Sequence, residues 1–363
     1  MDDESTKLPV AVPGVGVQRL SPSAAHVMSR VVADTLARAK GAVAPQLFRI
    51  GSYEFCRSDH EQVMLWALTL KVSAEQLLEW FEDTTRDCQY FYLEPPPPFV
   101  VRNGLIVSLA LRPKLFFWPE NRFDLCRLPA LETLWCRDNQ LMGLDLSAVP
   151  ELRKLDCKYN QLTELDLSAV PQLRELGCAR NLLTELDLSA VPELRELGCA
   201  GNQLTELGLS AAPKLRRLWC SDNHLTELGL SAAPELRELW CWHNQLTELD
   251  LSAVPELREL WCAENQLREL DLSAVPELRE LRCRDNQLTE LDLSAVPELC
   301  GLRCQRNQLT ELDLSAVPEL SKLDCFGNRI RELTIRDHKL LKSVTCDPWV
   351  VVHKRPDQVV QHA

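Results

Sequence analysis

The chain has 363 residues, of which 45% are hydrophobic and 26% charged, and its formal net charge is −13. This length exceeds what one compact core usually holds, so it predicts two or three units or a single elongated one. The composition is typical of a soluble folded protein and excludes a chain that is disordered throughout. The sequence also lacks the run of about 18 apolar residues that a membrane-spanning helix needs.

The N-terminus and the cysteine content bear on the cellular compartment in which the protein folds. The chain begins Met1-Asp2-Asp3-Glu4, without the basic and apolar segments of a Sec-type signal peptide. We therefore expect a cytoplasmic protein, or one delivered into a host cell by a non-Sec route. In such a protein the 15 cysteines favour metal binding or catalysis over disulfides, and their spacing decides between structural and chemical roles.

The first third of the chain predicts a small helical domain. Residues 1–22 are rich in proline and glycine and predict a disordered lead. Apolar residues at helical spacing predict a helix from Ser23 to about Lys40, and capping boxes at Ser58 and Ser73 predict helices over 59–71 and 74–83. We assign 23–95 to this domain. Residues 96–130, which begin with a stiff run of prolines, are expected to be a linker and degenerate N-terminal repeats or a cap.

A repeat of 21 residues then fills 131–340 in ten units. Cysteine recurs at this step from Cys136 to Cys346, which accounts for 11 of the 15 cysteines, and asparagine recurs from Asn139 to Asn328. The unit reads Leu-x-x-Leu-x-Cys-x-x-Asn-Gln-Leu-Thr-Glu-Leu-Asp-Leu-Ser-Ala-Val-Pro-Glu. We number its positions from the first Leu. Residues 341–363 keep part of this frame and predict a C-terminal cap with a strand from Trp349 to His353.

The pattern of the unit predicts stacked coils. Leu and Cys at alternate positions put apolar side chains on the inner face of a short strand, and stacking closes a continuous core. Each asparagine amide is expected to donate to and accept from the backbone of adjacent coils. The second half of the unit is too short for a return helix, and its proline removes a donor where no ladder partner is expected.

These residues resemble the leucine-rich repeats, whose consensus Leu-x-x-Leu-x-Leu-x-x-Asn/Cys-x-Leu is met with Cys in place of the third Leu. The nested second half is similar to the 21-residue IRREKO class of bacterial leucine-rich repeats. The resemblance implies a repeat solenoid with a parallel β-sheet on its concave face and short extended or turn segments on its convex face. It also implies protein recognition and no chemistry of its own.

The cysteine column predicts a buried row of small apolar side chains, because zinc ligands cluster instead of recurring once per coil. We expect no metal and no cofactor. An unpaired row also favours a reducing compartment. Cys56, Cys88, Cys126 and Cys300 lie off the column, in no motif that indicates a nucleophile.

The ten near-copies differ mainly at the fifth, seventh and eighth positions, whereas the exposed Thr, Glu and Ser of the second half hardly change. Since fifth and seventh side chains point outward from the concave sheet, this pattern predicts a partner-binding surface. Relaxed constraint on the strands or uneven recent duplication is the alternative.

The candidate binding residues fall into three zones on this surface. Gly177 and Gly198 are expected to form a bare patch, a row of tryptophans an aromatic ledge, and a group of arginines a donor cluster for a carboxylate or phosphate. The ledge and donor residues are Trp135, Trp219, Trp240, Trp242, Trp261, Arg282, Arg284, Arg303 and Arg306. This order favours one extended ligand, although the tryptophans could also serve only to cover the sheet.

The outer surface and the concave face of the repeats are predicted to differ in charge. The Glu and Asp columns of the second half make the outer surface anionic, which disfavours nucleic acid and acidic membranes. The fifth and seventh positions are expected to make the concave face locally basic. At the eighth position, Asp222, His243, Glu264 and Asp285 could form a metal site or an acid–base pair, but on an exposed ladder we favour simple surface neighbours.

The sequence therefore favours a noncatalytic, monomeric interaction scaffold with a protein partner. The resemblance to bacterial leucine-rich repeats implies, more narrowly, a bacterial effector or adaptor. One alternative is a ubiquitin-ligase-type effector enzyme that uses Cys56, His60 and Cys88 of the N-terminal domain. A second alternative is a carbohydrate-binding module that stacks sugar rings on the tryptophan row.

Overall fold

A computed structural model of the protein describes residues 48–50, 53–70, 74, 78, 100–102, 105–110, 122–123, 125 and 128–363. The chain divides into two compact units, Met1–Leu47 and Phe48–Ala363, and all described elements belong to the second. The predicted lead over 1–22 and the predicted helix from Ser23 lie outside the described residues, as does the run of prolines after residue 94.

A hairpin and a helix open the second unit. Strands β1 (Phe48–Ile50) and β2 (Tyr53–Phe55) pair antiparallel, and α2 (Arg57–Leu70) follows. The capping box expected at Ser58 is wrong, because Ser58 lies inside the helix and its hydroxyl donates to the Asp59 carboxylate at 2.6 Å. A small helical domain over 23–95 is not confirmed. In the described part of the chain, no helix is long and apolar enough to cross a membrane.

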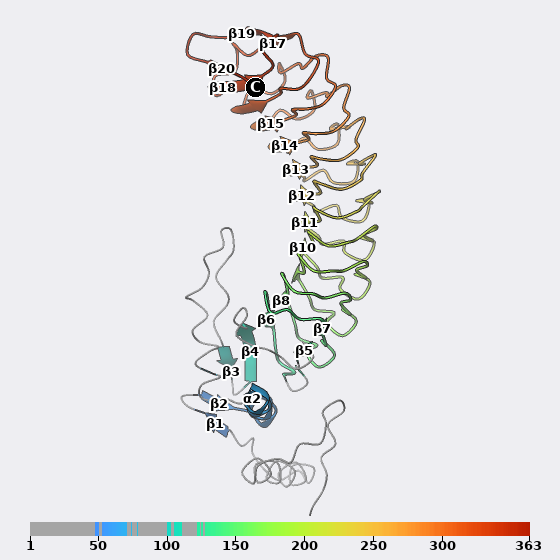
Figure 1. Ribbon diagram of the computed structural model, residues 1–363, viewed down its shortest axis with the longest axis vertical. Coiled ribbons are helices and arrows are strands. Elements are labelled where there is room, and N and C mark those ends of the chain that lie inside the picture. The colour runs from blue at the N-terminus through green and yellow to red at the C-terminus, as the bar shows by residue number, and fades with distance from the viewer. Residues whose placement is uncertain are drawn as a thin grey trace, which may run out of the picture. The chain divides into compact units, whose positions relative to one another are not determined.

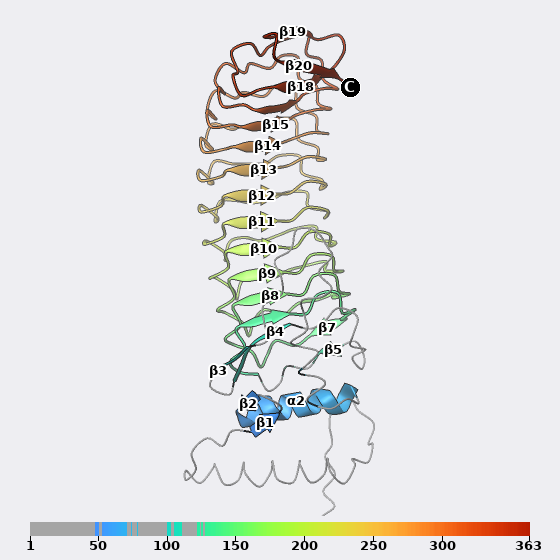
Figure 2. The same ribbon diagram turned by 90° about the vertical axis from the view of Figure 1, so that its left-hand side faces the viewer.

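One sheet of 14 strands runs through the repeats and their flanks. Each repeat contributes its third to fifth residues as a strand, and successive strands pair in parallel (Figures 1 and 2). At the N-terminal end, β3 (Val100–Arg102) pairs antiparallel with β4 (Leu105–Ala110), which continues in parallel to the first repeat. The repeat strands are β6 (Thr133–Trp135), β8 (Lys154–Asp156), β9 (Glu175–Gly177), β10 (Glu196–Gly198), β11 (Arg217–Trp219), β12 (Glu238–Trp240), β13 (Glu259–Trp261), β14 (Glu280–Arg282), β15 (Gly301–Arg303) and β16 (Lys322–Asp324). The predicted solenoid with a parallel sheet is therefore confirmed.

The return segments on the other side of each coil are turns, with no helix anywhere in 128–363. Two short parallel pairs occur there, β5 (Arg122–Phe123) with β7 (Gly143–Leu144), and β17 (Glu332–Thr334) with β19 (Val351–His353). In a typical coil the Ser252 backbone N–H donates to the Asp250 carboxylate at 2.9 Å. The hydroxyl and N–H of Ser252 lower the pKa of Asp250, so this carboxylate stays charged while it closes the turn.

The core is a stack of identical layers. Within one coil, Leu257, Leu260, Cys262 and Val275 have no exposed surface. Full burial of such a side chain contributes about 1.5 to 3 kcal/mol. All eleven cysteines of the column are buried and free, as the spacing predicts. Burial raises the pKa of the Cys262 thiol to about 12, which keeps it protonated and apolar in character.

The asparagine column connects each coil to the one before it. The side-chain amide of Asn265 donates to the carbonyls of Cys241 at 3.0 Å and Cys262 at 3.1 Å, and its oxygen accepts from the backbone N–H of Leu246 at 3.0 Å. These backbone groups lie at the bend where the strand ends, so no neighbouring strand can bond them. The predicted role of the asparagine is confirmed.

The residue before each asparagine takes a left-handed backbone, a feature that the sequence analysis missed. The φ angle is 55° at His243 and 53° at Glu264, and glycine fills the same position at Gly201 with 67°. The chain must turn sharply here to present the asparagine to the interior. Non-glycine residues accept this turn at a cost of about 1 kcal/mol each.

The C-terminal cap closes the stack with polar groups. Strand β18 (Ser343–Cys346) continues the sheet, and β20 (Val359–His362) pairs with it in parallel as the last strand. The Asp347 carboxylate accepts from the backbone N–H groups of Gly327 at 2.9 Å and Asn328 at 3.2 Å. In an earlier coil the equivalent N–H of Glu264 donates instead to the backbone carbonyl of Arg284. The amide of Gln358 donates to the carbonyls of Ile335, His338 and Leu341.

The asparagine column gives a stability prediction. Replacing Asn265 with Ala leaves backbone groups of two coils buried without partners, so the free energy of unfolding should fall by about 2 to 4 kcal/mol. Urea unfolding followed by circular dichroism measures the change. The matched control is Gln266→Ala on the exposed surface, which should change it by less than about 0.5 kcal/mol. Equal effects of the two changes would contradict the assigned role.

The cysteine column gives a labelling prediction. Because the column thiols are buried and protonated, iodoacetamide should leave Cys262 unmodified in the folded protein, whereas the exposed Cys300 should react. Peptide mass spectrometry before and after unfolding in urea measures both sites. Comparable labelling of Cys262 and Cys300 in the folded protein would argue against a dry interior.

Candidate functional site

The outward side chains of the sheet form columns because the strands pair without a shift. Trp219, Trp240 and Trp261 are in direct register with one another, and so are Glu238, Glu259 and Glu280. The fifth position thus forms one column and the third position another on the same face. The sequence analysis considered the fifth and seventh positions but missed the third, although the period of two places all three together.

The tryptophans of β11, β12 and β13 form a continuous stack. The rings of Trp240 and Trp261 lie parallel, with 4.1 Å between centroids and 2° between planes. Trp219 is tilted by 47° against Trp240 at 5.6 Å, and the Arg282 guanidinium lies 3.6 Å from the centroid of Trp261. We call Trp219, Trp240, Trp261 and Arg282 the tryptophan stack. Its ring faces contact one another, so the stack presents ring edges to solvent.

The indole N–H groups of the stack are poorly satisfied. Those of Trp219, Trp240 and Trp261 are all buried without a hydrogen-bond acceptor in the described structure. The Trp240 N–H is close enough to the Glu259 carboxylate to lower its pKa, but burial of that carboxylate raises the pKa more. A buried N–H group without an acceptor costs free energy. Stabilisation of the fold is therefore not a sufficient reason for three tryptophans at these positions.

The expected bare patch at Gly177 and Gly198 is wrong. A Cβ at residue 177 would meet the Lys158 side chain at 2.5 Å, and one at residue 198 would meet the Trp219 ring at 3.4 Å. The glycines therefore make room for long side chains from adjacent coils that lean across the sheet. No open pit for a ligand backbone remains at these two positions.

The arginines also differ from the expectation of a free donor cluster, because each contacts a carboxylate of this chain. Arg282 pairs with Glu280 at 3.1 Å, and Arg284 pairs with Glu264 and Asp285. The remaining two contacts are longer, Arg303 with Asp324 at 3.5 Å and Arg306 with Asp285 at 3.4 Å. Each of the four guanidinium groups therefore already has a carboxylate within 3.5 Å, so these residues do not form a cluster of unpaired donors.

Two further tryptophans lie apart from the stack. Trp135 is only 5% exposed, with the Arg137 guanidinium 5.2 Å and the Lys154 ammonium 5.6 Å from its ring. Its proposed contact with a partner is therefore contradicted by burial. Trp242, at the seventh position, is half-buried and lies parallel to the His243 ring at 6.2 Å.

The third column makes the face beside the tryptophan stack acidic, which corrects the expectation of a basic face. Arg217 is shared by Glu196 at 2.7 Å and Glu238 at 3.1 Å. Among the described residues, no cation lies within 4.0 Å of the Glu259 carboxylate. Burial, followed by the carboxylates of Glu238 and Glu280, raises the pKa of Glu259. This half-buried carboxylate thus has no ion-pair partner among the described residues, and the more distant Arg282 guanidinium offsets its raised pKa only in part.

The eighth-position column contains surface ion pairs. His243 Nδ1 lies 2.6 Å from Asp222 Oδ1, whereas Glu264 and Asp285 contact Arg284 instead of the histidine. In the part of the chain that the structure describes, no three His, Cys, Asp or Glu side chains converge as metal ligands would. Of the alternative catalytic set, Cys56 immediately precedes α2, His60 lies in its first turn, and Cys88 lies outside the described residues.

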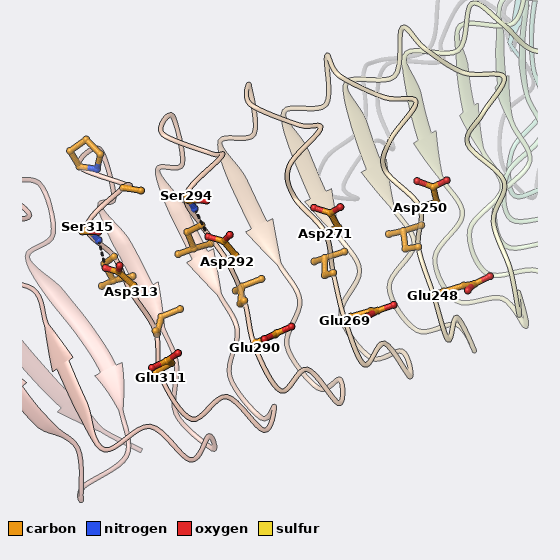
Figure 3. Close-up of a pocket in the computed structure, with 18 of the residues that line it drawn as sticks. Glu248, Asp250, Glu269, Asp271, Glu290, Asp292, Ser294, Glu311, Asp313 and Ser315 are labelled. Carbon is orange, nitrogen blue, oxygen red and sulfur yellow. Dashed lines mark hydrogen bonds between the residues drawn. The ribbon is translucent and has the colours of Figure 1, made fainter.

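An acidic groove runs along the return segments. Its walls are a row of Glu at the thirteenth position and a row of Asp at the fifteenth, with leucines between them (Figure 3). The labelled carboxylates are Glu248, Asp250, Glu269, Asp271, Glu290, Asp292, Glu311 and Asp313. The Asp side chain accepts the Ser N–H in these turns, which gives the frequent Asp and Ser columns a structural cause, although Gly208 and Gly229 replace Asp in two units. The frequent Thr and Glu of the twelfth and thirteenth positions have no such cause.

Glu259 gives a prediction about stability and pH. A raised pKa in the folded state means that ionised Glu259 destabilises the fold at neutral pH, and that this penalty disappears as pH falls below the ordinary value of 4.5. Glu259→Gln should therefore raise the melting temperature at neutral pH, and the gain should vanish in acid. Thermal melts from neutral pH to pH 4 test this. Glu269→Gln on the exposed groove is the control, and an equal gain from it would contradict the prediction.

Part of the repeat region matches a known protein family. Residues 213–253 and 234–274 match the family described as "Leucine Rich repeats (2 copies)". No curated protein sequence matches the chain.

Solved structures extend the likeness over a larger share of the chain. The functional domain of InlJ from Listeria monocytogenes, described as including a cysteine ladder, is 32% identical with a TM-score of 0.51. The match covers 62% of this chain and 60% of that one. YopM from Yersinia enterocolitica is 28% identical with a TM-score of 0.50, over 62% and 53% of the two chains. The similarity thus spans less than two thirds of either relative.

A third structure shows the shared fold alone. The leucine-rich repeat protein of Leptospira interrogans is 23% identical with a TM-score of 0.58, over 64% of each chain. The protein is therefore a leucine-rich repeat protein with repeats of about 21 residues and a buried cysteine ladder, similar to bacterial internalins and YopM.

Proposed function

We propose that the protein is a noncatalytic interaction scaffold that binds a protein partner on the concave sheet face. Leucine-rich repeats are typically protein–protein interaction domains, and no catalytic domain is evident in the described residues. The observation that carries the finer proposal is where the ten copies differ. Variation concentrates on outward positions of the sheet, while the inward Leu, Cys and Asn positions are constant. A surface diversified on a copied framework is what a recognition site requires.

The tryptophan stack is the proposed centre of the interface. Its side chains are fixed by their neighbours before a partner binds, so little conformational entropy is lost on binding. Aromatic side chains held in this way are frequent anchors in protein interfaces. The stack is bordered on one side by the charged Glu238 and Glu259, and on the other side Trp242 extends its aromatic surface. This arrangement fits an aromatic centre with a charged rim along one side.

A sugar ligand fits the stack less well. A sugar ring stacks on an open indole face, but Trp240 and Trp261 cover one another at 4.1 Å, and Arg282 covers the outer face of Trp261. The arginines that could have held a phosphate or carboxylate are engaged in ion pairs. A protein surface that contacts ring edges and side carboxylates remains the better match.

We further propose a role as a bacterial effector or adaptor. The similarity to InlJ and YopM supports a bacterial origin, and a row of free thiols supports a reducing compartment, either the cytoplasm or a host cell reached by a non-Sec route. A ubiquitin-ligase-type activity of the N-terminal region is the second candidate. Self-ubiquitylation assays with Cys56 and Cys88 replaced by Ser test that activity directly.

The interface prediction concerns two tryptophans. Trp240→Ala with Trp261→Ala should weaken capture of the partner by at least about 30-fold, because central aromatic anchors contribute roughly 2 kcal/mol or more each. Affinity capture with quantitative mass spectrometry, followed by Kd measurement on the recovered partner, tests this.

The matched control is Trp349→Ala, which removes a tryptophan that is 62% exposed on the C-terminal cap. All variants should melt within a few degrees of the wild type, since the Leu and Cys core is untouched. Capture that persists in the double variant would contradict the placement of the interface.

A further inference from the structure

The tryptophan stack is bordered by a strip of charged residues on the third column, and this strip is not balanced. It contains Glu196, Arg217, Glu238, Glu259 and Glu280, and Arg282 of the stack reaches Glu280. Four carboxylates face two guanidinium groups. This column changes on the following coils, where Gly301 and Lys322 take the place of glutamate. The excess negative charge on this column thus lies on the coils of β10 to β14, which include the three that hold the tryptophans.

Glu259 is the centre of this excess. Its strand neighbours in register are Glu238 and Glu280, and each of those has an arginine partner, Arg217 at 3.1 Å and Arg282 at 3.1 Å. The adjacent Arg258 cannot supply the missing charge, because its guanidinium is held by Glu277 at 3.0 Å. Within the described structure, Glu259 therefore has carboxylates on both sides and no ion-pair partner of its own.

The environment of Glu259 favours binding of a cation from a partner. The carboxylate is half-buried beside the Trp240 indole, so a positive charge placed there interacts through a medium less polar than water. The edges of the neighbouring indoles supply apolar contact for the methylene stem of a lysine or arginine. An acidic partner segment would instead bring like charges together at the same place.

We propose that the partner presents a basic segment to this face, with a lysine or arginine side chain paired to Glu259 against the Trp240 and Trp261 edges. This inference rests on the proposed function and specifies the chemistry of the partner at that site. The arginines in the sequence had indicated an acidic ligand, with a carboxylate or phosphate. The structure favours a basic one, because the arginines are paired and the unpaired charge on this face is the Glu259 carboxylate.

Selection from a random peptide library displayed on phage tests the inference. The full chain is the bait, and peptides that also bind the Trp240→Ala, Trp261→Ala chain are discarded. The retained peptides should be enriched in Lys and Arg over the starting library. Synthetic copies should bind about tenfold more weakly to Glu259→Gln than to the wild type, and more weakly as salt is raised.

The control is Glu269→Gln, which removes the same charge from the acidic groove of Figure 3 and should leave Kd within about twofold. Thermal melts show that both variants remain folded. Peptides that depend on the tryptophans but are neutral or acidic would overturn the basic partner and leave the proposed interface standing. Equal losses with Glu259→Gln and Glu269→Gln would also overturn it. A selection that yields no tryptophan-dependent peptide would contradict the interface itself.

Discussion

The repeats depend on one buried hydrogen-bonding arrangement, the asparagine amide at the bend after each strand. Stacking coils with no helix brings the backbone of every turn into the interior, where a peptide group without a partner costs about 1 to 3 kcal/mol. The amide of Asn265 reaches carbonyls of two coils and accepts an N–H from the earlier one, so it satisfies groups that no strand ladder can reach. The positive φ angle of the residue before it turns the backbone so that this side chain points inward. Leucines and cysteines then fill the space that the aligned turns leave.

This framework determines what the outer surface can do. Because each asparagine fixes the next coil at the same register, every outward side chain faces its equivalent one coil away. Side chains that gain from self-contact form continuous structures, as Trp240 and Trp261 do, whereas charges of one sign are forced together, as at Glu238, Glu259 and Glu280. The chain relieves this repulsion in most places by placing an arginine within reach. Glu259 is where that compensation is missing, and such a local imbalance is more informative about a partner than the net charge of the whole chain.

Much of the fold was predictable, because it repeats. The step between cysteines identified the coils, and ten copies of the same spacing separated inward from outward positions without any relative for comparison. The role of Asn265 and the burial of Cys262 also followed, since only one arrangement lets these residue types recur once per coil. The N-terminal region had no such redundancy. There a local capping signal at Ser58 misplaced the start of α2, whose first turn instead follows directly from the β1–β2 hairpin.

The site was less predictable, for a physical reason. The sequence by itself determined the solenoid, its layers and the columns of side chains on each face. Only the tertiary structure decided which of those side chains are free, because long side chains lean across coils and meet partners 19 to 21 residues away. Lys158 fills the space over Gly177, Lys154 and Arg137 cover Trp135, and Glu280 takes up Arg282. From residue types alone, all of these outward side chains would be counted as free to contact a partner. In the folded structure, the edges of the tryptophan stack and the Glu259 carboxylate remain free to do so.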